Sequence, residues 1–310
     1  MIIRSTGSWY DVQLEDGKIL QCRMKGKFRL DGKKLTNPVA VGDFVMIEKE
    51  HQQEVGVIKS IEDRKNYVVR QSPRKKHFLH IIAANIDQAI LIVTIKSPNL
   101  KQGFIDRFLL MTEPYNIPVH IFFNKCDLYE EADLEIYNVL AEIYEKIGYH
   151  CYLTSAISNV GLKDMQDIIK NKVSLFSGQS GVGKSSLINL LLPDFQIKTK
   201  ILSDFTGKGQ HTTTFAEMYN LGEGTKIIDS PGIKTLSYNH LKVQDVAHNF
   251  REFFTASKHC KFADCTHRNE PKCAIKNGLD NGEFSELRYF NYLQILEDIE
   301  DQNYWERNLG

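Results

Sequence analysis

The octapeptide GQSGVGKS at residues 178–185 constrains the fold of this chain more than any other sequence feature. It matches the phosphate-loop pattern G-x-x-x-x-G-K-[ST], follows the apolar run VSLFS and precedes the helical pattern SSLINLLL. A strand, a glycine-rich loop and a helix in this order form the context that the pattern requires. The sequence therefore predicts an α/β domain that binds a nucleotide by its phosphates.

The chemistry of this loop assigns a role to each of its residues. Glycines let the backbone approach phosphates closely with its N–H groups turned inward, and the helix that follows adds the positive end of its dipole. We expect Lys184 to bridge the β- and γ-phosphates and Ser185 to bind Mg²⁺. The other loop residues expected to contact the phosphates are Gly178, Gln179, Ser180, Gly181, Val182 and Gly183.

The motif NKCD at 124–127, directly after the apolar run VHIFF, indicates which base is bound. A carboxylate at Asp127 can accept hydrogen bonds from both the ring N–H and the exocyclic amine of guanine, whereas adenine offers no such pair. Asn124 and Lys125 would hold the loop and flank the base. In TSA at 154–156, which also follows a strand pattern, Ser155 belongs to the same site and the N–H of Ala156 would meet the guanine oxygen.

Two further segments complete the expected nucleotide site. DSPG at 229–232 follows the strand pattern TKIID, which places Asp229 beside Mg²⁺ and the N–H of Gly232 near the γ-phosphate. Upstream, GQHTTT at 209–214 lies in a long polar segment with little apolar periodicity. One threonine of this segment should complete the magnesium shell. We favour Thr213, with Thr212 and Thr214 as alternatives.

The pattern of apolar and polar residues divides the chain into distinct regions. Residues 1–70 alternate in short runs broken by turns, which predicts an all-β barrel, an OB-fold first and an SH3-like barrel second. Residues 71–80 read as a linker. Residues 81–238 alternate apolar strands with helical patterns, typical of a doubly wound parallel sheet. Residues 239–310 read as mostly helical, with a Cys/His-rich interruption.

That interruption has the spacing C-x4-C-x-H-x5-C, formed by Cys260, Cys265, His267 and Cys273. Three thiolates and one imidazole make a closed tetrahedral set that suits one structural Zn²⁺. His259 is a competing ligand, but its adjacency to Cys260 makes simultaneous ligation awkward. Cys22, Cys126 and Cys151 are scattered, and we expect them to act as small buried hydrophobes.

The chain as a whole has no net charge, but its charged residues are unevenly distributed along the sequence. Lys+Arg and Asp+Glu both number 39, yet residues 1–75 carry a net +5 and residues 281–310 a net −5. The basic end suits nucleic-acid phosphates, although ordinary solvated faces would look the same. Trp9, Phe28 and Phe44 could stack on bases, but core packing is the expected fate of each. The basic residues concerned are Arg23, Lys25, Lys27, Arg29, Lys33, Lys34, Arg74, Lys75, Lys76, His77 and His80.

The motifs run in a permuted order: base-binding loops first, then the phosphate loop, the threonine segment and DSPG. Because these loops all leave the carboxyl ends of strands, one site survives the change of chain ends. The segment after DSPG then leads into the C-terminal region, which would couple the γ-phosphate sensor to it. With the barrel and the Cys/His cluster, this order resembles the RsgA (YjeQ) family of ribosome-associated GTPases over essentially the whole chain.

The resemblance implies an OB-fold, a circularly permuted GTPase domain and a zinc-binding C-terminal domain. It also implies action in late maturation of the small ribosomal subunit, with the subunit and its rRNA as partners that stimulate hydrolysis. No run approaches the ~20 apolar residues that span a bilayer, and no secretory signal pattern opens the chain. We therefore expect a cytoplasmic protein without a membrane partner, and a monomer.

The position after DSPG raises a question about hydrolysis. Many GTPases place a glutamine there to orient water, but this chain has Ile233. We expect His211 to orient or accept from the attacking water, as the resemblance also suggests, although it could serve only to fold its loop. A partner would accelerate slow intrinsic turnover by ordering residues 200–215. The alternatives are an RNA-binding chaperone with nucleotide as a conformational lock, and a P-loop ATPase or kinase.

Overall fold

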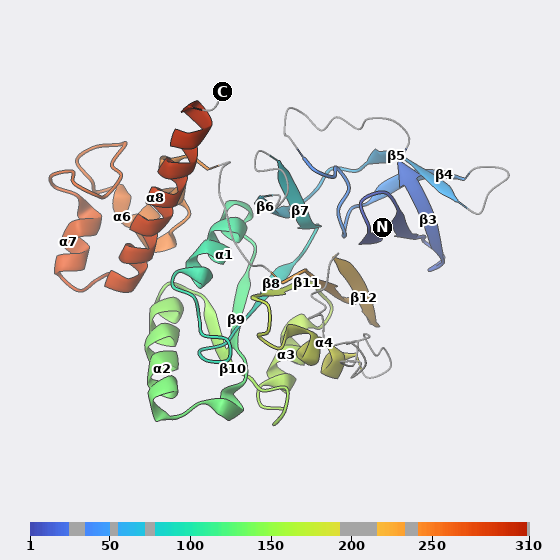
Figure 1. Cartoon of the computed structure of the whole chain (residues 1–310), viewed down its shortest axis with the longest axis horizontal. Helices are drawn as coiled ribbons and strands as arrows, with labels where there is room; N and C mark the ends of the chain where they lie inside the picture. Colours follow the sequence, from blue (N-terminus) through green and yellow to red (C-terminus); the bar gives the residue numbers. More distant parts are fainter. Residues whose placement is uncertain (25–34, 50–54, 72–77, 193–215, 233–240, 309–310) are drawn as a thin grey trace.

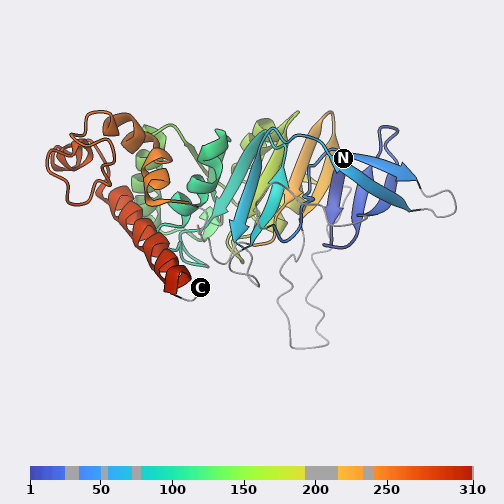
Figure 2. The ribbon, with the colours of Figure 1, turned by 90° about the horizontal axis from the view of Figure 1, so that it is seen from above.

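The computed structural model describes residues 1–24, 35–49, 55–71, 78–192, 216–232 and 241–308, of which 71 and 302–308 by backbone alone. The chain forms an N-terminal barrel, a central α/β domain and a C-terminal group of helices (Figure 1). The barrel and the C-terminal helices lie at opposite ends of an elongated molecule, with the central sheet between them (Figure 2). Among the described helices, none combines the length and apolarity needed to cross a bilayer.

The central sheet has the order β10-β9-β8-β11-β13-β12. Neighbours from β10 to β13 pair in parallel, and β12 pairs antiparallel with β13. Residues of β8 are fully buried along its whole length, as expected for a strand covered on both faces. The strands are β8 (Gln88–Val93), β9 (Val119–Phe123), β10 (His150–Leu153), β11 (Val173–Gly178), β12 (Glu217–Gly222) and β13 (Thr225–Asp229).

Helices cover both faces of this sheet. One hydrophobic core joins the sheet to α1 and α2 through residues such as Phe108 and Leu140, and a second joins it to α3 and α4 through Met165 and Leu187. This is the doubly wound arrangement predicted from the alternating pattern. The connecting elements are α1 (Phe104–Thr112), η1 (Glu113–Tyr115), η2 (Cys126–Leu128), α2 (Glu131–Lys146), α3 (Leu162–Ile169) and α4 (Lys184–Leu191).

The N-terminal strands form a small barrel with the order β1-β2-β3-β5-β4, in which β3 and β5 pair in parallel. Backbone bonds from Ile2 N to Asp43 O (2.8 Å) and from Gly42 N to Ile2 O (2.9 Å) bring the end of this order back to β1. A five-stranded, partly open barrel of this kind is the predicted OB-fold. Its strands are β1 (Ile2–Ser5), β2 (Tyr10–Gln13), β3 (Ile19–Met24), β4 (Val45–Lys49) and β5 (Gly56–Ile61).

The barrel and the central domain share one sheet. Strand β1 pairs antiparallel with β12 through Arg4 and Glu217, so an 11-stranded sheet runs through both parts in the described residues. Glu217 in turn lies opposite Asp229 at the end of β13. The edge of the central sheet that would otherwise be open is therefore covered by the barrel.

The segment 71–80, expected as a linker, begins and ends in paired strands. β6 (Tyr67–Gln71) and β7 (Leu79–Ala84) form a two-stranded antiparallel sheet, with Arg70 opposite His80. Burial, followed by the nearby Arg70, lowers the pKa of His80 to about 4. The lowered pKa disfavours a positive charge on His80, which the sequence groups with the basic residues of this stretch.

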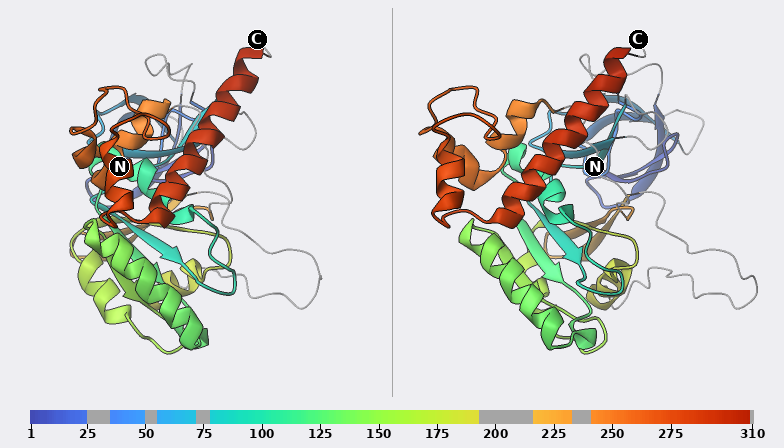
Figure 3. Two further views of the ribbon diagram at one scale, coloured as in Figure 1. Left: turned by 90° about the vertical axis from the view of Figure 1, so that its left-hand side faces the viewer. Right: turned by 60° about the vertical axis from the view of Figure 1, so that its left-hand side comes forward.

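The C-terminal helices pack on the α1/α2 side of the central domain. The longest of them, α8, crosses this face and its C-terminal end projects beyond the body (Figure 3). Its acidic residues are partly tied down: Asp298 pairs with Arg107 at 2.7 Å and Glu300 pairs with Arg268 at 2.6 Å. The helices are α5 (Val243–His248), α6 (Arg251–Ser257), α7 (Ala274–Asp280) and α8 (Glu286–Asn308).

A buried polar cluster joins this unit to the central domain. Arg288 of α8, only 3% exposed, donates to Asp106 of α1 at 2.5 Å and bidentately to Glu252 of α6 at 2.7 and 2.9 Å. Asp106 also accepts from the Tyr144 hydroxyl at 2.8 Å and from the Asn291 side-chain amide. Because every charge in the cluster has hydrogen-bonded partners, its burial is tolerated and it fixes how α8 docks.

Candidate nucleotide site and metal centre

The phosphate loop lies where the sequence places it, between β11 and α4. β11 ends at Gly178 and α4 begins at Lys184. Gly181 and Gly183 have φ values of 87° and 88°, which L side chains rarely adopt. A Cβ on Gly183 would collide with the side-chain amide of Asn124, so this glycine also permits the close approach of the base-binding loop.

Behind the loop, Lys184 and Asp229 form a buried ion pair, with side chains 6% and 2% exposed. Gly232 lies over the loop as well, because a Cβ on it would come within 3.4 Å of the Ser180 backbone. The structure thus brings together the lysine, the carboxylate and Gly232, which the sequence assigned to the phosphates and Mg²⁺. Asp229 offers a buried carboxylate and Ser185, the second residue of α4, offers a hydroxyl, and Mg²⁺ prefers oxygen ligands of this kind.

The NKCD loop is fastened directly to the phosphate loop. Asn124, 1% exposed, donates from its side-chain amide to Val182 O at 2.7 Å, and Lys125 Nζ donates to Gly181 O at 2.8 Å. The side-chain oxygen of Asn124 is buried and has no hydrogen-bond partner in the described structure. The two loops are therefore fastened to each other through Asn124 and Lys125.

Asp127 is exposed, and the Ser155 hydroxyl orients it by donating to Oδ1. The same hydroxyl accepts from the backbone N–H groups of Ile157 and Ser158, each at 3.1 Å. Ser155 is fully buried while the neighbouring Ala156 is half-buried at the rim. Ser155 thus joins the NKCD and TSA motifs, and the Asp127 carboxylate remains exposed to solvent.

Some features of the site were missed by the sequence reasoning. The Tyr129 hydroxyl donates to Asn124 O at 2.8 Å and accepts from Ile95 N at 3.0 Å, and burial raises the pKa of Tyr129 to about 12. The side-chain oxygen of Gln179 is buried without a hydrogen-bond partner in the described structure. A tyrosine two positions beyond NKCD carries no motif that would have signalled this role. His211, Thr213 and Ile233 lie outside the described residues.

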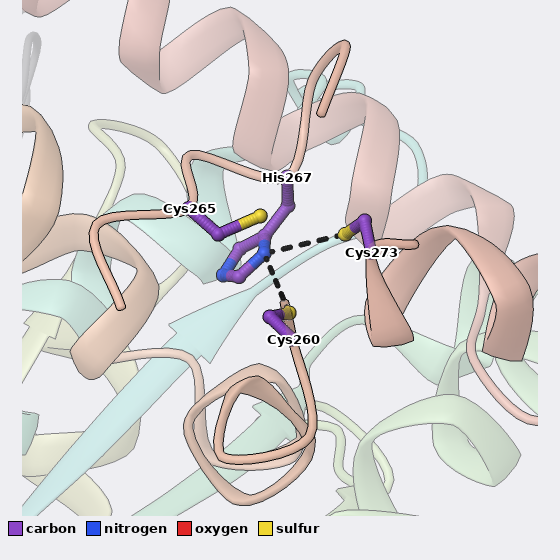
Figure 4. Close-up of side chains that lie close together, drawn as sticks. All are labelled: Cys260, Cys265, His267 and Cys273. Carbon is purple, nitrogen blue, oxygen red and sulfur yellow. Dashed lines mark hydrogen bonds between the residues drawn. The ribbon is translucent and has the colours of Figure 1, made fainter. Parts of the chain in front are cut away.

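Cys260, Cys265, His267 and Cys273 converge in the C-terminal unit, as the spacing predicts (Figure 4). Their candidate ligand atoms all lie within 4.8 Å of one another. The Cys273 and Cys260 sulfurs are 3.5 and 3.7 Å from His267 Nδ1. Ligands at about 2.3 and 2.0 Å from one tetrahedral Zn²⁺ would lie about 3.5 Å apart, so these distances fit a shared ion.

Glu270 shapes the loop that carries His267. Its carboxylate accepts from the backbone N–H groups of Thr266 (2.7 Å) and Arg268 (2.8 Å) and from the Thr266 hydroxyl (2.6 Å). Tyr289 of α8 donates to His267 O at 2.6 Å. The imidazole is thus oriented by a hydrogen-bonded frame that the sequence did not reveal. These four ligands could hold one metal ion.

The surface of the barrel departs from expectation at two aromatics. Trp9 and Phe44 are 40% and 47% exposed, so the expectation that they fill the core is wrong. Tyr10 and Val12 fill it instead, with Ile2, and Tyr10 is held by a 2.7 Å hydrogen bond to Asn37. The remaining cysteines largely follow expectation: Cys22 and Cys151 are buried and Cys126 is half-buried. Arg23 is exposed, whereas Phe28 and residues 25–34 lie outside the described residues.

Comparisons with known proteins agree with this geometry. A family model described as "RsgA GTPase" matches residues 61–239, and one described as "RsgA N-terminal domain" matches residues 1–58. The chain belongs to the RsgA GTPase family. It is 46% identical to the protein named small ribosomal subunit biogenesis GTPase RsgA of Phocaeicola vulgatus, over 98% of each chain. A protein of the same name from Flavobacterium johnsoniae is also 46% identical, over 97% of this chain and 93% of that one.

Solved structures of the RsgA family extend the similarity to three dimensions. The crystal structure of YjeQ from Thermotoga maritima superposes with a TM-score of 0.74 at 33% identity, covering 96% of this chain and 97% of that one. YloQ, described as a circularly permuted GTPase, gives a TM-score of 0.71 at 30% identity, covering 97% and 94%. The permuted order inferred from the motifs is therefore confirmed, and the chain is a GTPase.

Proposed function

We propose that this RsgA-family GTPase hydrolyses GTP to GDP and phosphate during biogenesis of the small ribosomal subunit, the process for which its relatives are named. The observation that carries the nucleotide assignment is the Ser155-oriented Asp127 carboxylate, joined through Asn124 to the loop that holds Lys184. Guanine would meet the carboxylate, and the phosphates would occupy the glycine-rich loop. The barrel (1–70), linker (71–80), GTPase domain (81–238) and C-terminal domain (239–310) are the units of this proposal.

Within this site each residue has a distinct task. Asn124, Lys125, Asp127, Ser155 and Ala156 bind and orient the base. Lys184 exchanges its ion pair with Asp229 for the β- and γ-phosphates, while Gly232 offers an N–H to the γ-phosphate. Ser185, Asp229 and Thr213 would hold Mg²⁺, which neutralises charge on the phosphates when bound. Backbone N–H groups of Gly178, Gln179, Ser180, Gly181, Val182 and Gly183 complete the phosphate cradle.

For hydrolysis, water attacks the γ-phosphate in line with the leaving oxygen. Ile233 offers no hydrogen bond to this water, so His211 is the side chain that we assign to orient it. Lys184 and the loop N–H groups stabilise the developing charge. We expect slow turnover by the isolated chain and acceleration by a partner that contacts the segment containing His211.

The partner surface is proposed on chemical grounds. Exposed Trp9 and Phe44 on the basic barrel suit stacking on unpaired bases, and Arg23 suits a phosphate. One structural Zn²⁺ at Cys260, Cys265, His267 and Cys273 would stiffen the C-terminal unit, because a closed four-ligand set leaves no open position for chemistry. Ribosomal RNA of the small subunit is the target that these surfaces and the names of the relatives support together.

Three measurements test the proposal. Calorimetry should show binding of GDP and no comparable binding of ADP. Sedimentation with small subunits should show retention with a non-hydrolysable GTP analogue and release with GDP, and added subunits should raise multiple-turnover phosphate release. Equal affinity for adenine and guanine nucleotides would refute the base assignment. Subunit binding without stimulated turnover would favour an RNA-binding chaperone that uses GTP only as a conformational lock.

A further inference from the structure

One loop, residues 95–103, lies between the nucleotide site and the C-terminal unit. It follows β8 and precedes α1. At its first half, Lys125 Nζ donates to Ser97 O as well as to Gly181 O of the phosphate loop. Pro98 lies next to the same glycine, since a Cβ on Gly181 would be 3.7 Å from Pro98 Cδ. The base-flanking lysine is thus held by the 95–103 loop and the phosphate loop together.

Two more bonds attach this end of the 95–103 loop to the site. The Tyr129 hydroxyl links Ile95 N (3.0 Å) to Asn124 O (2.8 Å), and the fully buried Thr94 donates to Pro98 O at 2.6 Å. A shift of the loop would therefore move the carbonyl that Lys125 uses, and it would strain the backbone of Asn124.

The other end of the loop is attached to α8. Gln102 Nε2 donates to Asn291 Oδ1 at 2.5 Å. Asn291 is 2% exposed and is itself held by Asp106, which also binds Arg288. Arg107 adds a second tie, because it donates to Gln102 O at 3.3 Å and pairs with Asp298 of α8 at 2.7 Å.

Between these two ends the loop has further anchors on one side and a cavity on the other. Lys96 pairs with Asp133 at 2.7 Å and with Glu130 at 3.0 Å, and Leu100 packs against the main core. A cavity of about 440 Å³ lies among the loop, α2 and α8, and Leu100, Ile136, Leu140 and Leu287 are among its walls. A segment that borders a cavity makes fewer packing contacts on that side, so its hydrogen bonds and ion pairs contribute more to its position. Lys125 therefore holds the loop at its nucleotide-site end and Asn291 holds it at its α8 end, while Lys96 ties the first half to the start of α2.

We propose that Gln102 and Asn291 are positioning residues for Lys125, so that docking of α8 sets how tightly the site retains a guanine nucleotide. This inference rests on the proposed function, since it takes guanine to pack against Lys125. Coupling of this kind is reciprocal, so bound nucleotide also stabilises the docked α8. The route is separate from the chain connection between DSPG and α5. A partner that displaces α8 would accelerate nucleotide release through it.

The test compares Gln102→Ala with Glu300→Gln in the full-length, metal-loaded protein. Gln102 is exposed, so its replacement by alanine spares the core and keeps the carbonyl that Arg107 uses. Glu300→Gln weakens the bidentate pair between α8 and Arg268 without touching the loop. The readouts are the dissociation rate of fluorescently labelled GDP, and hydrogen exchange of residues 286–293 with and without GDP.

We expect Gln102→Ala to release GDP about threefold to tenfold faster than the wild type, the range for one lost hydrogen bond. Glu300→Gln should release GDP at the wild-type rate. GDP should slow exchange over 286–293 in the wild type and in Glu300→Gln, but not in Gln102→Ala. A wild-type release rate in Gln102→Ala, or no effect of GDP on exchange in the wild type, overturns the inference. Absence of GDP binding by the wild type would instead refute the proposed function.

Discussion

Replacement of Ser155 by alanine tests the base-binding assignment at its least obvious residue. The Ser155 hydroxyl makes three hydrogen bonds: it donates to Asp127 and accepts from the N–H groups of Ile157 and Ser158. Asp127 is exposed, so without this bond its carboxylate is free to rotate among solvated rotamers. Guanine would then have to order the carboxylate on binding, and affinity should fall.

The magnitude follows from the kind of bond that is lost. A hydrogen bond to a charged group contributes about 1.5–3 kcal/mol, and an exposed acceptor places this one at the lower end. A loss of about 1.4 kcal/mol corresponds to a tenfold rise in Kd. We therefore expect Ser155→Ala to bind GDP about tenfold more weakly. Ser158→Ala, which keeps the backbone N–H that Ser155 accepts, should bind GDP as the wild type does.

The assay is calorimetric titration with GDP, IDP and pyrophosphate. The base of IDP lacks the exocyclic amine that should donate a hydrogen bond to Asp127. IDP therefore makes one hydrogen bond fewer with Asp127 than GDP does. The ratio of IDP to GDP dissociation constants should therefore shrink in Ser155→Ala, while pyrophosphate binds unchanged. Equal weakening of GDP and pyrophosphate would show that Ser155 supports the fold of the loop rather than the base contact. Unchanged GDP affinity would refute the role of Ser155 altogether.

Three further predictions concern the rest of the molecule. Asp106→Ala leaves the buried Arg288 without one of its two carboxylate partners. We expect this substitution to lower the free energy of unfolding, measured by urea denaturation, by about 3–5 kcal/mol. A loss under about 1 kcal/mol would contradict this prediction. Cys265→Ser should reduce bound zinc from one equivalent to none by elemental analysis, and full retention would remove Cys265 from the ligand set. Burial, and to a lesser extent the nearby His150, lowers the pKa of His120 from 6.5 to about 4. Between these two pH values the unfolded chain binds a proton at His120 that the folded chain does not bind. Stability should therefore fall as the pH drops from about 6.5 towards 4, and His120→Gln should lessen this fall in urea denaturation at a series of pH values. An equal fall in the wild type and in His120→Gln would contradict the prediction.

The nucleotide site was largely predictable because phosphate and metal chemistry fix both residue type and spacing. GQSGVGKS needs a strand before it and a helix after it, and β11 and α4 begin and end within a residue or two of the apolar patterns. The metal cluster was predictable for the same reason, since its four ligands lie within fourteen consecutive residues. Short-range chemical patterns of this kind survive any arrangement of the surrounding chain.

Long-range contacts were beyond the sequence. Nothing near Arg4 or Glu217 signals that β1 continues the central sheet, because strand pairing between distant segments leaves no local periodicity. The exposure of Trp9 depends on how the barrel strands pack together, and the lowered pKa of His80 depends on the partial burial of its side chain in β7. Gln102 carries no motif, and its position between two domains appears only when α8 is in place.

The pairing of β1 with β12 has a practical consequence for dissecting this protein. A fragment that begins after the barrel would expose the backbone donors and acceptors of β12, and bare strands of this kind recruit further chains. If such a fragment lost GTP hydrolysis, the loss could result from self-association as well as from the missing contact with RNA. Point substitutions on the outer surface of the barrel leave the pairing of β1 with β12 intact. They are therefore a better way to separate RNA binding from GTP hydrolysis.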